Sequence, residues 1–367
     1  MELARARILS IAPRILFTML PMTTNRDGSV RASLACALAL SLVLSACGSA
    51  SPNPASSPPM AMSSPLASAE PRALPPGSGE ASCSADQWCV VAGVPKQVTF
   101  SAIWGASPTD VWVVGEAGTL LHWNGSAWSS VVSGTESALR AVVGTSATDI
   151  WAAGLEGTLL HFDGSSWSAK QSDGTPWSPV VGPNQRPIYA LFAPQPNRVW
   201  AGGSGMRYFD GAKWSEPHHG SHLPTMAIWG LDPANTWAVG LQGTVNRLEG
   251  HEWARVGNDV GPNLFGIWGS AANDVWIVGS EGAVAHWNGA ARVAVPSGTN
   301  NDLHAVRGFA ANDVWAVGDQ GTILHWQGTA WKGSSSPSPR ALLGIWGASA
   351  GELWIVGENG LVLRRKG

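Results

Sequence analysis

One short phrase recurs seven times along this chain and limits its fold more than any other feature. The phrase is Val-Trp-Ala-Val-Gly or a close variant. Its tryptophans are Trp112, Trp151, Trp200, Trp237, Trp276, Trp315 and Trp354. Successive copies are 39, 49, 37, 39, 39 and 39 residues apart, and a glycine follows each tryptophan by three positions. A period of this length indicates a fold made of repeated supersecondary units.

The first repeat shows how one unit makes one blade of a propeller. Apolar residues alternate or cluster over 100–104, 111–114, 119–123 and 127–131, and glycine-containing turns separate these four segments. Asn124-Gly125 predicts a two-residue hairpin between the third and fourth strands, because both residues tolerate positive φ. We therefore predict an all-β, seven-bladed β-propeller over residues 83–367, with four antiparallel strands per blade.

The two ends of the repeated region predict how the ring closes. The seventh copy reaches Gly367 at the turn where its fourth strand would begin. Residues 86–91, Asp-Gln-Trp-Cys-Val-Val, match the fourth-strand pattern of the first blade instead. We predict that residues 86–91 complete the last blade.

Two tryptophan columns are interpreted as core. One column is the second-strand tryptophan of the recurring phrase. The other lies in the fourth strand, at Trp88, Trp128, Trp167, Trp214, Trp253 and Trp331, with Arg292 as the single departure. A buried aromatic side chain removes about 150–250 Å² from water. Because ligand-binding aromatics rarely recur in every blade, we prefer burial to a sugar-stacking role.

Recurring polar residues also fit a structural role. An acidic or amide residue precedes each column tryptophan, by two positions in six repeats and by three at Asn197: Asp110, Asp149, Asn197, Asn235, Asp274, Asp313 and Glu352. We expect these side chains to cap turns. Histidines recur at one third-strand position: His122, His161, His286 and His325. Because blades radiate from a centre, neither set can converge on one metal or one catalytic cleft.

Irregularities in the repeat predict the binding surface. The 49-residue interval holds about ten extra residues within 171–187, and the next connection of the same kind contains three histidines. Both join a fourth strand to a first strand, so they should share one face, where loops on a rigid scaffold bind partners. The candidate binding residues are Trp177, Asn184, Gln185, Arg186, His218, His219 and His222. The histidines could bind a transition metal, but loop histidines this close are more often solvated, so we predict no metal.

Composition and motifs argue against several function classes. Without residues 1–46 the chain has 17 basic and 23 acidic residues, which provides no electrostatic basis for nucleic-acid binding. No nucleophile elbow, P-loop, HExxH or dinucleotide fingerprint is present. We therefore predict no cofactor and no enzymatic activity.

The N-terminal region predicts export. Arg26 and Arg31 precede the apolar residues 32–44, and a Leu-Ser-Ala-Cys phrase follows. We assign 1–46 as a signal peptide, with translation starting at Met19 or Met22. Residues 47–82, rich in Pro, Ser and Ala, are interpreted as a disordered tether. In an oxidising compartment Cys83 and Cys89 plausibly pair; the alternative is two free thiols.

The Leu-Ser-Ala-Cys phrase resembles the lipobox of bacterial lipoproteins, which implies a lipidated Cys47 and an envelope, outer-membrane location. An ordinary secretory signal with an incidental cysteine is the alternative. By resemblance to the sorting rule of enteric bacteria, Gly48 favours the outer membrane.

Phrases such as 313–318 and 321–326 resemble tryptophan-rich repeats of exported deltaproteobacterial proteins, BNR-type repeats and photosystem II assembly-factor propellers. The sequence is similar, more weakly, to tectonin-repeat lectins. These resemblances imply a monomeric envelope lipoprotein that binds an envelope or extracellular protein. A lectin-like glycan binder and a propeller hydrolase or lyase are the alternatives.

Overall fold

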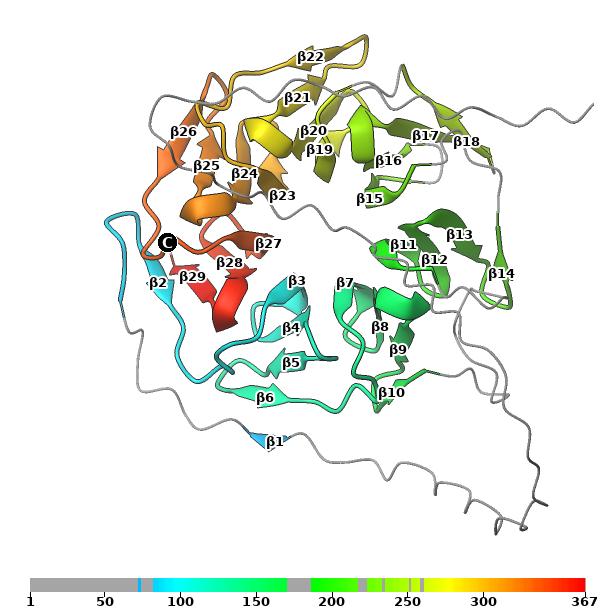
Figure 1. The fold of residues 1–367 in the computed structure, drawn as a ribbon, viewed down its shortest axis with the longest axis vertical. Coiled ribbons are helices and arrows are strands. Elements are labelled where there is room, and N and C mark those ends of the chain that lie inside the picture. The colour runs from blue at the N-terminus through cyan, green and yellow to red at the C-terminus, as the bar shows by residue number, and fades with distance from the viewer. Residues whose placement is uncertain are drawn as a thin grey trace, which may run out of the picture. The chain divides into compact units, whose positions relative to one another are not determined.

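The computed structural model describes residues 72–73, 82–169, 186–216, 223–232, 235–250, 252–257 and 261–366. These residues form a ring of seven antiparallel sheets, which confirms the predicted seven-bladed propeller (Figure 1). Each first strand contacts the first strand of the next blade, and the seventh contacts the first, so the ring is closed. The predicted signal peptide and Cys47 lie outside the described residues. Within the described part, no helix has the length and apolar character needed to cross a bilayer.

Each blade runs outward from the centre of the ring. The first strands are β3 (Phe100–Ser107), β7 (Leu139–Ser146), β11 (Ile188–Gln195), β15 (Thr225–Gly230), β19 (Leu264–Ala271), β23 (Leu303–Ala310) and β27 (Leu342–Ser349). The second strands are β4 (Asp110–Gly115), β8 (Asp149–Gly154), β12 (Arg198–Gly203), β16 (Thr236–Gly240), β20 (Asp274–Gly279), β24 (Asp313–Gly318) and β28 (Glu352–Gly357). The third strands are β5 (Leu120–Trp123), β9 (Leu159–Phe162), β13 (Gly205–Phe209), β17 (Val245–Glu249), β21 (Val284–Trp287), β25 (Ile323–Trp326) and β29 (Val362–Lys366). The fourth strands are β6 (Trp128–Ser130), β10 (Trp167–Ser168), β14 (Trp214–Ser215), β18 (Glu252–Arg255), β22 (Arg292–Ala294), β26 (Trp331–Ser334) and, for blade 7, β2 (Trp88–Val90).

Ring closure follows the prediction from the sequence. β2 pairs antiparallel with β29, with Trp88 opposite Arg365, and so completes blade 7. The Asp86 carboxylate accepts hydrogen bonds from the backbone N–H of Ser335 (2.5 Å) and from its hydroxyl (2.8 Å). These bonds join the closing segment to blade 6 as well. In the structure Cys89, a residue of β2, forms a disulfide with Cys83.

Two local features differ from expectation. Asn124 and Gly125 belong to a four-residue loop, because Trp123 pairs with Trp128, so the two-residue hairpin was wrong. The Asn124 side chain explains the longer loop, since its Oδ1 accepts the backbone N–H groups of Ser126 (3.0 Å) and Ala127 (2.9 Å). Residues 72–73 of the predicted tether form strand β1 (Arg72–Ala73), which pairs with β6 at the edge of blade 1.

The two tryptophan columns pack against each other between blades, which confirms their structural role, although Trp167 and Trp214 are only partly buried. Each second-strand tryptophan is at most 4% exposed. A fourth-strand tryptophan packs edge-to-face on the second-strand tryptophan of the preceding blade. The six pairs, with their ring-centroid distances, are Trp128–Trp354 (5.6 Å), Trp167–Trp112 (5.3 Å), Trp214–Trp151 (6.2 Å), Trp253–Trp200 (5.1 Å), Trp331–Trp276 (5.3 Å) and Trp88–Trp315 (5.7 Å). Edge-to-face geometry is favoured by the ring quadrupoles.

The inner layer uses a second contact, in which a first-strand tryptophan packs on a first-strand glycine of the next blade. Trp104 of blade 1 lies over Gly144 of blade 2, and Trp268 of blade 5 lies over Gly308 of blade 6. A Cβ atom at Gly144 would be 2.5 Å from the Trp104 ring, and one at Gly308 would be 2.4 Å from Trp268. Glycine is therefore needed at these positions so that adjacent blades can approach each other.

We expect Trp88→Ala to destabilise the whole ring, because this side chain is fully buried and anchors the closing strand on Trp315. The loss should be about 3–5 kcal/mol in free energy of unfolding, as for other buried tryptophans. Urea denaturation followed by circular dichroism measures it. The control is Val293→Ala, an exposed site on β22. If both variants unfold at the wild-type urea midpoint, closure by residue 88 does not stabilise the ring.

Candidate binding face

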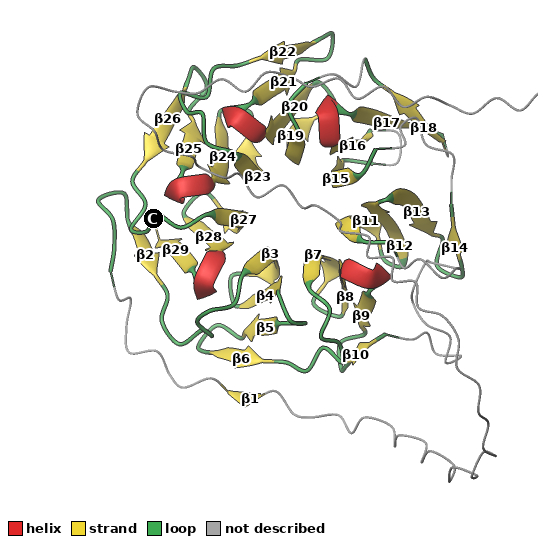
Figure 2. Ribbon diagram, in the orientation of Figure 1, coloured by secondary structure: helices red, strands yellow, loops and turns green. Residues whose placement is uncertain are grey.

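Two kinds of loop meet on one face of the propeller, which we call the connection face. The first kind joins second to third strands, and in five blades it forms a short 3-10 turn (Figure 2). These turns are η1 (Leu155–Gly157), η2 (Leu241–Gly243), η3 (Ser280–Gly282), η4 (Asp319–Gly321) and η5 (Glu358–Gly360). The second kind joins a fourth strand to the next first strand. Backbone hydrogen bonds link the two kinds, for example from Leu155 N–H to Ala138 C=O (2.9 Å).

Arg186 is the one predicted binding residue that lies within the described part of the chain. It is exposed on the connection face just before β11, and its Nη1 donates to the Ser204 carbonyl (3.2 Å). Ser204 lies in the shortened hairpin of blade 3, where Gly203 pairs directly with Gly205. The other six candidates, Trp177, Asn184, Gln185, His218, His219 and His222, lie outside the described residues. No metal-binding group of three or more His, Cys, Asp or Glu residues occurs among the residues that are described.

A buried arginine close to Arg186 was missed by the sequence analysis. Arg207 lies opposite Ala201 in blade 3, and its side chain is only 2% exposed. Ala201 and Phe209, on the same side of the sheet, pack against blade 2, so Arg207 lies between blades 2 and 3. The equivalent residues in other blades are Leu121, Leu160, Asn246, Ala285, Leu324 and Leu363. An arginine among mostly apolar residues at one repeat position is the signal that could have revealed it.

The charge of Arg207 is only partly compensated. Its Nε lies 3.4 Å from Glu216 Oε1, but Glu216 is 68% exposed. Nε and Nη1 make no hydrogen bond within the structure as described. Burial lowers the pKa of Arg207; the Glu216 carboxylate opposes this shift and the Arg186 guanidinium adds to it. An arginine nevertheless stays protonated. The corner therefore combines an exposed and a buried cation with one exposed carboxylate, which favours an anionic group of a ligand.

The centre of the connection face carries a second set of side chains that sequence reasoning missed. The second residue of each first strand lines a small central cavity of about 220 Å³. These residues are Ser101, Arg140, Tyr189, Met226, Phe265, His304 and Leu343. In the sequence, the second residue of each first strand varies from blade to blade, whereas the residues on either side of it are mostly apolar. This variation is the signal that could have revealed the cavity lining. Arg140 Nη1 donates to Ser101 Oγ (3.2 Å), and His304 Nε2 lies 2.7 Å from Asp319 Oδ1.

The recurring acidic residues and histidines form a structural unit within single blades. In blade 2, Asp149 Oδ1 accepts from Trp151 Nε1 (3.1 Å) and lies 2.8 Å from His161 Nε2. Blades 1 and 6 repeat this arrangement. The structural interpretation is therefore supported, but the contact differs from turn capping: the carboxylate ties the second strand to the third.

The environment of Asp149 holds its carboxyl group ionised. Burial acts to raise the pKa of Asp149, but hydrogen bonds with His161, Thr145 and Trp151 outweigh it, and the pKa lies below its ordinary value. Each such carboxylate is engaged by its own blade. The arrangement therefore offers no pair of carboxyl groups that converge on one cleft in the manner of a general acid and base.

Comparison with known proteins places the chain in a class of folds. No protein-family model matches it, and no curated protein matches its sequence. Among solved structures it is similar to YCF48 bound to D1 peptide, with 17% identity and a TM-score of 0.62, over 78% of this chain and 99% of that one. YCF48 from Cyanidioschyzon merolae is similar with 15% identity and a TM-score of 0.61, over 76% of this chain and 98% of that one.

A third likeness is to the WD40 β-propeller domain of Doa1, with 12% identity and a TM-score of 0.58, over 75% of this chain and 94% of that one. Identities at this level show the fold alone. They confirm the β-propeller part of the resemblance that the sequence suggested. The lipoprotein type and the tectonin likeness stay predictions.

We expect the contribution of Asp149 to stability to disappear in acid. Because its folded-state pKa is depressed, the contribution is present above the unfolded-chain value of about 3.9 and is lost as the pH falls through the folded-state pKa. At pH 7, Asp149→Asn should cost about 1–3 kcal/mol in free energy of unfolding. Urea denaturation of both proteins from neutral pH down to about 3 should show this difference shrinking.

The same comparison in a His161→Gln background separates the carboxylate from the imidazole that faces it. If the difference in free energy of unfolding between the wild type and Asp149→Asn stays constant down to the lowest pH, the prediction is contradicted.

Proposed function

We propose that this chain is a non-catalytic lipoprotein of the cell envelope whose propeller binds a segment of a partner protein. The observation that carries the proposal is the corner between blades 2 and 3, where Arg186 and Arg207 lie side by side. Among the described residues only Glu216 forms an ion pair with Arg207. A buried cation is costly to fold unless it is compensated. An acidic segment of a partner would supply the missing compensation.

The position of this corner supports binding. It lies on the connection face, where the extra residues within 171–187 and the histidine-containing connection also begin and end. We propose that Trp177, Asn184, Gln185, His218, His219 and His222 contribute to the same surface. One of the similar solved structures is described as YCF48 bound to D1 peptide, so a propeller of this fold binds a peptide.

The proposal of an anchored protein rests on the N-terminal sequence. Lipidation of Cys47 would attach the chain to a membrane, since each buried CH₂ contributes about 0.8 kcal/mol and two acyl chains bind stably. The residues between Cys47 and the propeller would separate the binding face from the membrane, and export would place Cys83 and Cys89 where a disulfide persists. The outer membrane is the location we propose.

Binding at the blade 2–3 corner can be tested with Arg207→Leu. This change restores the residue found in four other blades, so stability should be unchanged or higher by about 1–4 kcal/mol. Capture of partners from envelope extracts by the wild-type chain, followed by mass spectrometry, should yield a protein that Arg207→Leu and Arg186→Glu recover at least about tenfold less.

The matched control is Arg340→Glu. Arg340 precedes β27 as Arg186 precedes β11, and its Nη1 donates to the Asn359 carbonyl (3.2 Å) in the same way. Equal recovery by all four proteins would refute this corner as the site. A glycan array with the same proteins tests the alternative of a lectin-like binder.

Removal of the proposed lipidation site should release the protein from the membrane. Cys47→Ser in the full chain is expected to move it to the soluble fraction and to abolish its labelling with radioactive palmitate. Cys83→Ser serves as a control, because it removes a cysteine without affecting the proposed anchor. Labelling that persists in Cys47→Ser would show that lipidation at this residue is wrong.

A further inference from the structure

Blade 5 departs from the repeat at two positions that face blade 4. Arg292 stands opposite Trp287 at the fourth-strand position where the six other blades have tryptophan. Ala285 stands opposite Ile277, where four other blades have leucine: Leu121, Leu160, Leu324 and Leu363. Both changes remove apolar volume from the outer layer of the same interface. At these two positions the blade 4–5 interface therefore carries less apolar bulk than the corresponding interfaces made by blades 1, 2, 6 and 7.

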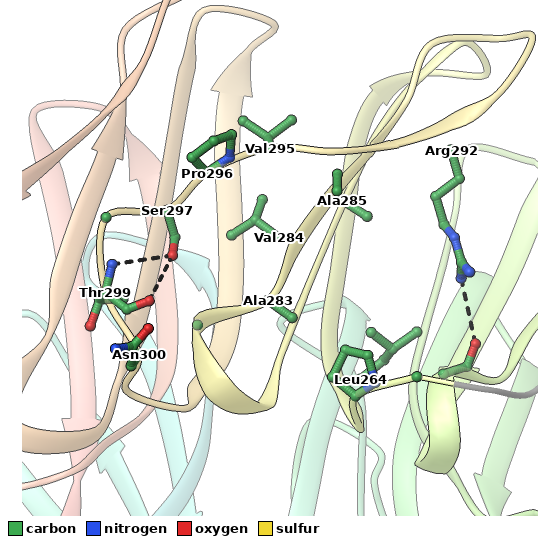
Figure 3. A pocket seen from close by; sticks show the side chains of 16 residues that line it. Leu264, Ala283, Val284, Ala285, Arg292, Val295, Pro296, Ser297, Thr299 and Asn300 are labelled. Atoms are coloured by element: carbon green, nitrogen blue, oxygen red, sulfur yellow. Dashed lines mark hydrogen bonds between the residues drawn. The ribbon is translucent and has the colours of Figure 1, made fainter.

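A pocket of about 800 Å³ lies at this place (Figure 3). Leu264 and Ala285 line it on the side of blade 4, and Val284 and Val295, which pack towards blade 6, line the other side (Figure 3). The corresponding pocket of blade 1, which Leu120 and Val131 help to line, has a volume of about 530 Å³. Neither Leu121 nor Trp128, the counterparts of Ala285 and Arg292, lines the blade 1 pocket, whereas both Ala285 and Arg292 line the pocket of blade 5. The smaller side chains thus extend the pocket into the interface.

The neighbouring tryptophan on blade 4 lacks the partner that its counterparts have. Trp237 contacts Trp287 at a tilt of 52° and the Arg247 guanidinium. The other six second-strand tryptophans each receive the edge or face of a fourth-strand indole, whereas Trp237 receives none among the described residues. Trp237 is nevertheless only 2% exposed and does not line the pocket, so an apolar group that enters would lie beside Ala285 and Leu264.

The charge at the pocket defines a second property of the ligand. Arg292 extends along one wall, and its Nη1 makes a single long hydrogen bond, 3.4 Å, to the Gly243 carbonyl (Figure 3). Within the described part of the chain it forms no salt bridge. A guanidinium beside a pocket with apolar walls favours a ligand that carries a carboxylate next to the apolar group that enters the pocket.

The edge of blade 5 can also receive an extended chain. All three residues of β22 are exposed, and Val293 is 48% exposed. On blade 1, the equivalent edge strand β6 pairs with an added strand, β1. The outer edge of a blade in this protein is thus able to accept a further strand, as in other cases of strand addition.

We propose that the interface of blades 4 and 5 is a second binding site, for an extended segment of a partner protein that carries an aromatic residue beside an acidic one. The segment runs along β22. Its aromatic side chain enters the pocket beside Ala285 and Leu264, and its carboxylate pairs with Arg292. This site is separate from the blade 2–3 corner and does not depend on it.

The test uses the full chain and a fluorescein-labelled hexapeptide, Ser-Ala-Trp-Glu-Ser-Val, which copies residues 126–131 except for the glutamate. Fluorescence anisotropy should show binding with a dissociation constant below about 1 mM. The double variant Ala285→Leu/Arg292→Trp rebuilds the consensus of blade 6 and should abolish binding. A peptide with alanine in place of tryptophan should not bind to the wild type.

Two further variants keep the test informative if the double variant fails to fold. Arg292→Gln should weaken binding of the acidic peptide about tenfold. It should leave the affinity for a peptide with glutamine in place of glutamate unchanged. Arg340→Gln, the matched surface control, and Arg207→Leu, at the separate corner, should not alter binding. No binding by the wild type up to about 1 mM, or equal binding by wild type and Arg292→Gln, would overturn the proposal.

Discussion

The edge-to-face contact between tryptophans of adjacent blades is the interaction on which the ring depends. Among the strands that the structure describes, none pairs with a strand of another sheet, so side-chain packing between blades is what holds the sheets in a ring. Six such contacts occur, each between the outer strand of one blade and the second strand of the blade before it. Closure uses the same contact, because Trp88 on β2 packs on Trp315 of blade 6. The N-terminal strand therefore supplies both the last strand of blade 7 and one of the repeated tryptophan contacts between blades.

A scaffold built this way can accept local departures, and the departures are where binding is proposed. Arg207 replaces an apolar residue between blades 2 and 3, and Arg292 replaces a fourth-strand tryptophan between blades 4 and 5. In both places a cation stands where the repeat has bulk and no charge. The polar residues that recur in most blades are engaged within their own blade, as Asp149 is by Trp151 and His161. Exceptions to the repeat are thus better guides to function here than the repeat's own conserved chemistry, because a ligand has to distinguish one part of the ring from the others.

Much of the fold could be predicted from residues that are close in sequence. Trp112 and its counterparts lie at nearly constant spacing, and residues 86–91 match the fourth-strand pattern, so the closing strand was recognisable. The hairpin at Asn124 was wrong in length because its side chain caps two N–H groups and stabilises a four-residue loop. Arg292 was visible as a departure, but its consequence was not, since the pocket needs Ala285 and the wall residue Leu264 as well. The residues that line the central cavity were missed for the same reason: Arg140, Tyr189 and His304 come from three blades.

The sequence by itself determined the number of blades, the order of strands within each blade and the burial of the tryptophans, because strand pairing between consecutive segments and apolar patterning are local properties. Only the tertiary structure decided which blade each tryptophan contacts, that Arg207 is buried beside Arg186, and that Ala285 and Arg292 open one pocket. Those facts depend on side chains that are brought together when whole sheets pack around a centre. The recurring phrase carries no record of that packing, since it is nearly the same in blades whose contacts with their neighbours differ.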